Sequence, residues 1–389
     1  MLVEIGYIWR MLNENRLEFK ANEAELTLGV ELELQVLDGQ SLLLTPRATD
    51  VLTELKDDKQ FAPEFFQSTL EIVSGVCHTV HDVERDLSGA LQRVKAVSSG
   101  MGLKMASTGT HPLGDYRDRL VTPSPRYNEL IDRNQWLIRR MAVYGMHIHV
   151  GMRSGDACMQ YNYFFMHFLP HIMSLSGSSP FWQGMYTGLS SCRPTTYEAL
   201  PTAGMPYMAR TWDEFEKLYG FLLRSGAIKS MKDLWWDLRP SPGYGTLELR
   251  FCDEPATLRE SLGIAAFVQL LGYWFKDHSE EWTTSQAPLK QWIFRENKWR
   301  AMRYGLDADI IVTRSGKTRA LRKELLKWLD VLAPYAKRME YQEYLEVVRD
   351  IINRGNSSMR QHNVFERSED LMRVVEHNVK EFEGNMPLW

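Results

Sequence analysis

Three segments of the chain alternate between apolar and polar residues with a period of two, which predicts β-strands with two unlike faces. They are Leu26–Leu37 (LTLGVELELQVL), Met146–Val150 and Thr246–Cys252. Successive side chains of a strand point to opposite sides, so each segment places ionisable or polar groups on one face and apolar groups on the other. We therefore expect a sheet with one face in the core and one polar face.

Apolar residues recur at intervals of three and four between and after these strands, which is typical of helices with one buried face. Such patterns cover residues 81–99, 127–142, 157–175, 212–224 and 257–276, and nearly all of 289–389 reads as helix. Because strands concentrate in the first two thirds, the pattern predicts an α+β fold with a largely antiparallel sheet, helices packed on its outer side and a helical C-terminal third. Without repeats or a long linker, we expect residues 1–389 to form one catalytic body.

The composition is that of an ordinary globular protein and narrows the classes of partner. The 389 residues include 44% hydrophobic and 25% charged side chains, enough apolar material for a large core. The formal net charge is only -4, so no basic excess is present to neutralise a phosphate backbone. Nucleic acid is therefore not an expected partner.

The cysteines and the N-terminus favour a reducing compartment. Cys77, Cys158, Cys192 and Cys252 form no CxxC pair, so neither a disulfide framework nor a thiolate zinc site is expected. Residues 1–20 have no long apolar core and no small-residue cleavage pattern, and we do not interpret them as a signal peptide. No run reaches the ~18 to 20 apolar residues that a membrane helix needs. We expect a cytoplasmic protein with no membrane partner, and a homodimer is left open.

Two carboxylates on the polar face of the first strand have a spacing that suits metal ions. Glu31 and Glu33 share this face with Gln35, while the valines and leucines between them share the other. Carboxylates at i and i+2 stand roughly 7 Å apart. They can share a pair of divalent ions lying ~3.5 to 4 Å apart.

Ionisable residues also occupy the polar faces of the other strands. They are His147 and His149 in the second strand, Glu248 and Arg250 in the third, and Glu64 and Glu71 in the segment PEFFQSTLEIVSG. If the strands are neighbours, these faces merge, and each pair of carboxylates ~6 Å apart at a dielectric of ~20 would cost on the order of 3 kcal/mol. A bound cation would offset this repulsion, and hard oxygen ligands suit Mg²⁺ or Mn²⁺ with positions left for substrate phosphates.

A single alternating strand with glutamates is more typical of a solvated sheet face, and a lone His-x-His pair is a weak metal signal. Three strands that all carry ionisable groups make that explanation less adequate. The pattern alone thus indicates a carboxylate-rich metal site without fixing its reaction.

Five motifs follow one another along the chain: GVELELQ (29–35), STLEIVSGVC (68–77), GTHP (109–112), GMHIHVG (145–151) and WWDLRPSPGYGTLELR (235–250). Together they resemble the carboxylate-amine ligase branch of the glutamate-cysteine ligase type 2 family. The resemblance spans roughly residues 25–280 and rests on the order and spacing of the motifs. It implies a fold similar to glutamine synthetase and the guanido kinases, in which a curved, mostly antiparallel sheet forms a funnel.

The activity that the resemblance implies is ATP-dependent amide formation through an acyl phosphate. In such ligases the acid is typically the γ-carboxylate of glutamate and the amine that of cysteine, as in glutathione-type biosynthesis. The cofactors would be ATP and Mg²⁺ or Mn²⁺, and the partners a small-molecule acid and amine.

The resemblance also assigns roles to residues at the matching positions. The metal ligands implied are Glu31, Glu33, Glu64, Glu71, His147 and Glu248. Glu31 and Glu33 would also serve the nucleotide phosphates, and Glu248 and Arg250 would be catalytic, with the guanidinium facing the transferred phosphate.

Further candidates follow from the implied mechanism. Arg239 and Arg193 would bind a phosphate or a substrate carboxylate, with a structural ion pair as the alternative for each. Thr110 and His111 would contact the acid, unless their turn only packs on the sheet edge.

Two other classes of function stay open at this stage. Carboxylates with histidine can equally activate water in a metal-dependent hydrolase, which would not need ATP. A non-catalytic ligand-binding homologue could keep the fold without turnover. Family members also carry a Gly-rich stretch before an Arg-Gln pair, whereas residues 355–361 here read GNSSMRQ, and their part in the site is open.

Overall fold

A seven-stranded antiparallel sheet forms the centre of the molecule in a computed structural model that describes residues 17–55, 58–285 and 289–389. The strand order is β10-β11-β5-β1-β3-β2, and β4 also pairs with β1. The strands are β1 (Leu28–Asp38), β2 (Phe61–Pro63), β3 (Thr69–Val73), β4 (Leu103–Ala106), β5 (Gly145–Gly151), β10 (Leu238–Ser241) and β11 (Thr246–Asp253). The expected antiparallel sheet of an α+β fold is confirmed, and the three strands predicted from alternation are its neighbours β1, β5 and β11.

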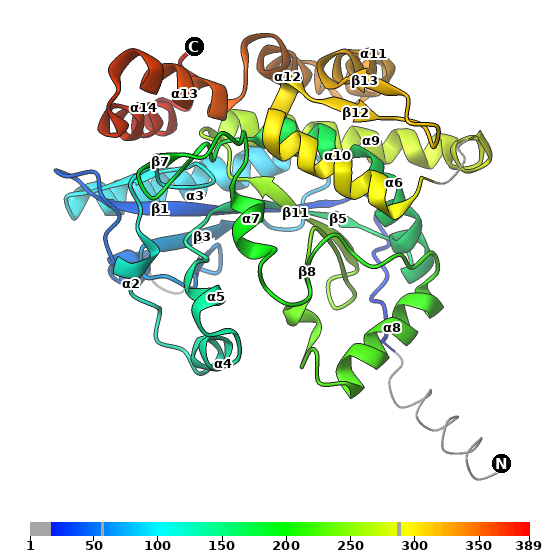
Figure 1. The fold of residues 1–389 in the computed structure, drawn as a ribbon, viewed down its shortest axis with the longest axis horizontal. Coiled ribbons are helices and arrows are strands. Elements are labelled where there is room, and N and C mark those ends of the chain that lie inside the picture. The colour runs from blue at the N-terminus through cyan, green and yellow to red at the C-terminus, as the bar shows by residue number, and fades with distance from the viewer. Residues whose placement is uncertain (1–16, 56–57, 286–288) are drawn as a thin grey trace.

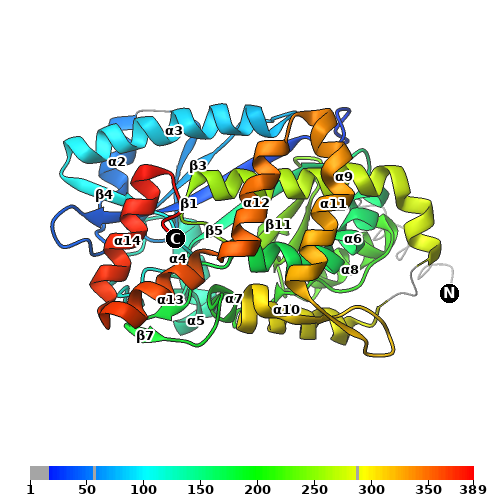
Figure 2. The ribbon, with the colours of Figure 1, turned by 90° about the horizontal axis from the view of Figure 1, so that it is seen from above.

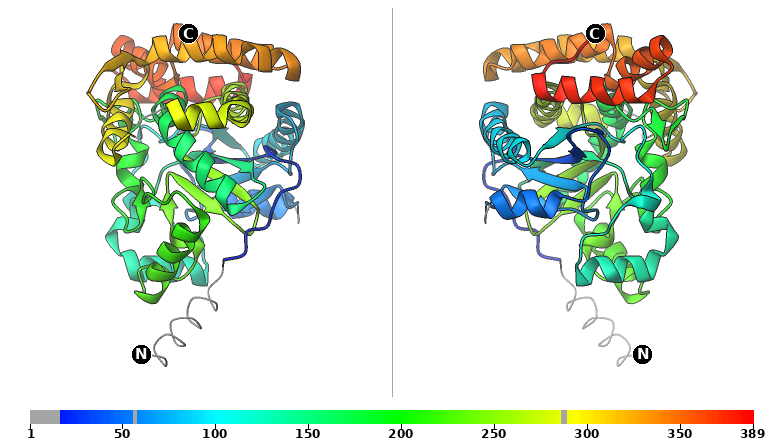
Figure 3. Two further views of the ribbon diagram at one scale, coloured as in Figure 1. Left: turned by 90° about the vertical axis from the view of Figure 1, so that its right-hand side faces the viewer. Right: turned by 90° about the vertical axis from the view of Figure 1, so that its left-hand side faces the viewer.

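Helices cover one face of this sheet in two layers (Figure 1). The inner layer is α3 (Val80–Gly100), α6 (Gly155–Ser176) and α9 (Leu258–Ser285). In the outer layer, α11 (Leu321–Met339) and α12 (Gln342–Arg354) lie over α9. Beside these layers, α10 (Gln291–Tyr304) packs against α6, α13 (Ser357–Ser368) packs against α14 (Leu371–Gly384), and α14 contacts β4. Seen from above, α11 and α12 cross over α9 (Figure 2), and the side views show the same order of layers (Figure 3). The helical C-terminal third is thus confirmed.

The period-two pattern of β1 explains which face the helices cover. Val30, Leu32 and Leu34 are buried in the main apolar core, together with residues of α3, α6 and α9. Glu31 and Glu33 alternate with them and point to the other side. The helix starts also follow from local chemistry: Thr79 forms a capping box at the start of α3.

The polar face of the sheet is flanked by shorter elements, which lie below the sheet in Figure 1. They include α4 (Pro125–Asn134), α5 (Trp136–Arg139), α7 (Arg193–Tyr197) and α8 (Trp212–Arg224), while α2 (Ala48–Leu55) packs beside α3 at the β2 edge of the sheet. Small pairs of strands complete the fold: β6 (Phe181–Trp182) with β7 (Met185–Tyr186), β8 (Ala203–Gly204) with β9 (Trp235–Trp236), and β12 (Asp309–Ile311) with β13 (Thr318–Ala320).

Two details differ from the sequence pattern. The single helix expected over 127–142 is divided into α4 and α5 at Gln135, whose φ of 50° is left-handed and cannot continue a helix. The C-terminal third contains the β12–β13 hairpin, which the helical pattern did not indicate. Among the described helices none is long and apolar enough to cross a membrane. The signal-peptide interpretation concerns residues 1–20, of which 1–16 lie outside the described residues.

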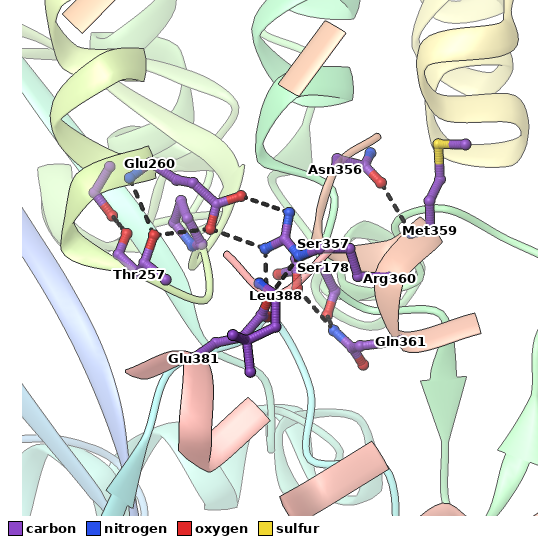
Figure 4. Close-up of polar contacts among 12 residues, drawn as sticks. Ser178, Thr257, Glu260, Asn356, Ser357, Met359, Arg360, Gln361, Glu381 and Leu388 are labelled. Carbon is purple, nitrogen blue, oxygen red and sulfur yellow. Dashed lines mark hydrogen bonds and ion pairs between the residues drawn. The ribbon is translucent and has the colours of Figure 1, made fainter. Parts of the chain in front are cut away.

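The GNSSMRQ stretch (355–361) anchors the C-terminal helices to the rest of the protein. Arg360 is buried between Glu260 of α9 and Glu381 of α14, with Nη1 2.9 Å from Glu260 Oε1 (Figure 4). Gln361 Nε2 donates to the carbonyl of Ser178 at 2.8 Å. Both side chains of the Arg-Gln pair therefore stabilise the packing of the helical layers.

Candidate active site

A cavity of about 360 Å³ opens on the polar face of the sheet, between the strands and the segments around α4, α5 and α7. Its charged and imidazole lining consists of Glu31, Glu33, Glu64, Glu71, Arg126, His147, His149, Arg193, Lys232, Arg239, Glu248 and Arg250. Aromatic and aliphatic side chains form the remaining wall: Phe65, Phe66, Tyr127, Leu130, Ile138, Met141, Val143, Tyr197, Trp235 and Tyr244, with Pro63 and Thr69 beside them.

The register of the sheet brings the ionisable residues together. In the ladders Glu33 lies opposite Glu71, Glu31 opposite His147, and Glu248 opposite His149 on one side and Arg239 on the other. Directly paired residues of neighbouring strands point to the same face. The polar faces that were expected to merge form one continuous row.

Glu31 lies at the centre of this row, between the two histidines. His147 Nδ1 is 3.0 Å from Glu31 Oε2, and His149 Nε2 is 3.2 Å from Glu31 Oε1. Burial opposes the charge of Glu31, but the hydrogen bonds to His147 and His149 outweigh it and lower its pKa. Burial lowers the pKa of His147 to about 4, so this imidazole is neutral near neutral pH. The neutral ring keeps a lone pair that can bind a metal ion.

Three carboxylates gather at the β3 end of the row. Ligand oxygens of Glu33, Glu64 and Glu71 lie within 4.8 Å of one another. Burial, followed by the charge of Glu64, raises the pKa of Glu33 to about 7, and burial likewise raises the pKa values of Glu64 and Glu71. Such a cluster holds protons unless a cation replaces them.

The donor set fits a hard divalent ion. Within the described residues, two further groups have ligand atoms within 4.8 Å of one another, Glu31 with Glu71 and His147, and Glu31 with His149 and Glu248. His147 Nε2 is buried without a hydrogen-bond partner there. Carboxylate oxygens with one or two imidazole nitrogens suit Mg²⁺ or Mn²⁺.

Three arginines lie beside the carboxylates. Arg239 bonds Glu248 at two points, and Arg250 pairs with the same carboxylate from its own strand. The β11 register shifts between Leu249 and Cys252, and the Arg250 N–H donates instead to the carbonyl of Asp237 at 2.8 Å. Leu249 and Phe251 are buried behind Arg250, as strand alternation predicts.

Arg193 enters the pocket from α7. Its Nη1 donates to the carbonyl of Arg250 at 3.1 Å, while its buried Nε has no partner among the described residues. Gly145 makes this approach possible, because a Cβ at that position would overlap the Arg193 guanidinium. The guanidinium therefore retains a donor for an anionic group.

The structure brings together most, but not all, of the residues singled out in the sequence. Glu31, Glu33, Glu64, Glu71, His147, Arg193, Arg239, Glu248 and Arg250 line the cavity. Thr110 and His111 do not: Thr110 Oγ1 donates to the Phe181 carbonyl at 2.7 Å, and His111 Nε2 lies 3.0 Å from the Leu42 carbonyl. Residues 355–361 are likewise absent from the lining.

His149 is a further candidate ligand that the sequence pattern signals but that the expected metal set did not include. His149 was placed on the polar face but not among the metal ligands, and it lies 3.2 Å from Glu31 and 3.8 Å from Glu248. Its position two residues after His147 on the same strand puts both imidazoles on one face. The aromatic wall from α4 and β9 had no sequence signal, since loop and helix segments bring it over the sheet.

Comparisons with known proteins agree with this geometry. Residues 27–377 match the sequence family described as "Glutamate-cysteine ligase family 2(GCS2)". A protein named "Putative glutamate--cysteine ligase 2" from Thermobifida fusca is 41% identical over 367 residues, covering 93% of this chain and 92% of that protein. One with the same name from Bdellovibrio bacteriovorus is 38% identical over 362 residues, covering 92% and 95%. The crystal structure of a glutamate-cysteine ligase from Francisella tularensis in complex with AMP has the same fold, with a TM-score of 0.66 at 13% identity over 93% of this chain and 90% of that one.

Proposed function

The chain belongs to the glutamate-cysteine ligase family 2, and on that premise we propose that its pocket joins the γ-carboxylate of glutamate to the amine of cysteine or another amino compound. The reaction class is that of an ATP-dependent carboxylate-amine ligase, which forms the amide through an acyl phosphate. The observation that carries the proposal is the merged acidic row of β1, β3, β5 and β11 with arginines beside it. This arrangement suits two anions that must be brought together.

Bound Mg²⁺ or Mn²⁺ would neutralise phosphate and carboxylate charge, and the residues that would hold it are Glu31, Glu33, Glu64, Glu71, His147, His149 and Glu248. The carboxylates of β1 and β3 would fix its position because they are half-buried and held by the sheet. Arg250, with a rigid fork of donors, suits the equatorial oxygens of a phosphoryl group in transfer. Arg239 keeps Glu248 neutralised while Arg250 turns to the phosphate.

The substrate carboxylates would be held by the cations of the opposite wall. Arg193 Nε has no hydrogen-bond partner within the described part of the chain, and Arg126 and Lys232 also line the cavity. These groups support an amino acid with a free α-carboxylate as the acid. The aromatic wall around Phe65 and Trp235 supports exclusion of water from an acyl phosphate.

The alternative hydrolase would use the same carboxylates and histidines to activate water. The arginines favour the ligase, because a hydrolase needs no set of cations for two separate anions. We also propose that the whole chain acts as one catalytic body in a reducing cytoplasm, consistent with the buried free thiols of its four cysteines and the anchoring of α13 and α14 by Arg360.

The test is release of ADP by the purified chain supplied with ATP, Mg²⁺, glutamate and a panel of amines. We expect ADP only when metal, acid and amine are all present. Mass spectrometry should then detect the amide formed from the acid and the amine. A Glu248→Gln variant serves as the inactive control. Hydrolysis of an amide or phosphate ester at a comparable rate without ATP would overturn the proposal in favour of the hydrolase.

A further inference from the structure

A second cavity, of about 490 Å³, lies on the helical side of the sheet. It is bounded by α6, α9, α10, α11 and β12, which lie together at the upper right of Figure 1. None of its lining residues also lines the active-site pocket. Its volume is within the range of roughly 300 to 1,000 Å³ that is usual for small-molecule sites.

Aromatic rings form the walls of this cavity. The lining includes Phe168, Trp274, Trp282, Phe294 and Trp328. The Trp328 ring is edge-on to Phe168 with centroids 4.7 Å apart, and edge-on to Trp274 at 4.9 Å. Perpendicular rings of this kind offer both faces and edges to a flat aromatic guest.

His171 supplies an unsatisfied polar group in this apolar lining. Its side chain is 5% exposed, and Nε2 is buried without a hydrogen-bond partner among the described residues. Two other histidines of the lining, His167 and His278, bond the Tyr163 and Trp274 carbonyls through Nδ1, both at 2.9 Å. Neither of them has a buried ring nitrogen without a partner among the described residues. Buried polar atoms in native proteins usually have a partner, which here would be a ligand.

The charged side chains at the rim do not select a charged ligand. Arg319 is already paired with Glu324 at 3.0 Å, and the remaining charged residues of the lining, Lys327 and Glu281, have opposite signs. Burial lowers the pKa of His171 to about 3, so the imidazole is neutral and offers one donor and one acceptor. Shape, aromatic contact and one hydrogen bond therefore decide what fits.

We propose that this cavity binds a small, uncharged, flat aromatic molecule with one hydrogen-bonding group, its ring against Trp274 and Trp328 and its polar atom on His171. An indole-like bicycle meets this description. The site is separate from the active-site pocket and does not depend on the proposed ligase function.

Indole and indene test the proposal, because they share a shape and only indole carries an N–H. Titration calorimetry on the full chain should give a dissociation constant for indole below about 1 mM. Indene should bind about fivefold more weakly or worse, as expected for the loss of one neutral hydrogen bond. Saturating ATP and the active-site variant Glu248→Gln should leave indole binding unchanged.

Two variants locate the site. His171→Phe should bind indole and indene equally, and Val331→Trp, which fills the cavity from α11, should bind neither. The proposal is overturned if the native chain does not bind indole, if it binds both probes equally, or if ATP displaces indole. The comparison of the two probes on the native chain stands even if a variant fails to fold.

Discussion

Glu248 and Arg239 face each other across the β10–β11 ladder and form a two-point ion pair, with Nε 2.9 Å from Oε2 and Nη2 3.0 Å from Oε1. Arg250 contacts the same carboxylate. Burial opposes the charge of Glu248, but Arg250 and Arg239 outweigh it and lower its pKa. The carboxylate therefore stays ionised with two cations beside it, and one of them can serve an incoming anion.

The first prediction concerns Arg250, which is the more exposed of the two arginines at 21% against 14% for Arg239. Arg250→Lys should keep the melting temperature and the ATP dissociation constant nearly unchanged, because Arg239 still neutralises Glu248. Turnover should fall by ~10²-fold or more, since a point charge cannot make the bidentate contact in the transition state. A large loss of stability with normal turnover of the folded fraction would show that Arg250 holds the sheet.

The second prediction concerns the metal ligands. Glu31→Gln removes the carboxylate shared by two of the three ligand groups, so Mn²⁺ affinity should fall by at least ~10-fold, a loss that even an outer-shell change can produce. Free Mn²⁺ measured by electron paramagnetic resonance during titration reports this directly.

The matched control for the metal site replaces all four cysteines by alanine. Their thiols are buried and form no disulfide, and none belongs to a ligand group found in the described residues. Mn²⁺ affinity should therefore change by no more than about twofold in the folded variant. Strong metal loss in that variant would contradict the assignment of the carboxylates.

Side-chain alternation was sufficient to predict which residues share a polar face. The sequence indicated the face of Glu31 and Glu33, but not that Glu71 lies opposite Glu33 or His149 opposite Glu248. A period of two is local, whereas strand order depends on long-range pairing that packing decides. The sequence therefore predicts the members of the site strand by strand, and only the folded sheet shows which of them lie together.

The residues that sequence motifs could not place are those whose role depends on remote contacts. His111 belongs to a motif of the family resemblance, yet its ring bonds the Leu42 carbonyl, far along the chain. Arg360 is likewise part of a motif, and its partners lie on α9 and α14. A motif fixes residue types but not which face of the protein they reach.

The third prediction uses the pH dependence of stability. Burial lowers the pKa of His111 to about 4, so between about pH 6.5 and pH 4 the unfolded chain binds a proton that the folded chain does not. The contribution of neutral His111 to the free energy of unfolding is complete above that pH window and is lost as the pH falls through it. The difference in unfolding free energy between the native chain and His111→Asn, measured by urea denaturation, should thus be larger at about pH 7.5 than at about pH 5. If the variant instead has a raised KM for the acid and this free-energy difference does not change with pH, His111 contacts the substrate.

The fourth prediction separates a structural role of Arg360 from a catalytic one. Arg360→Met leaves Glu260 and Glu381 buried without their cation and should cost ~3 to 5 kcal/mol of unfolding free energy. Arg349→Met is the matched control, because Arg349 pairs with Glu346 at the surface and should cost less than ~1 kcal/mol. Adding Glu260→Gln and Glu381→Gln to Arg360→Met removes the unpaired charges and should restore part of the loss. Turnover per folded molecule should stay near the native value throughout, and a variant that keeps its melting temperature but loses turnover would place Arg360 in the active site instead.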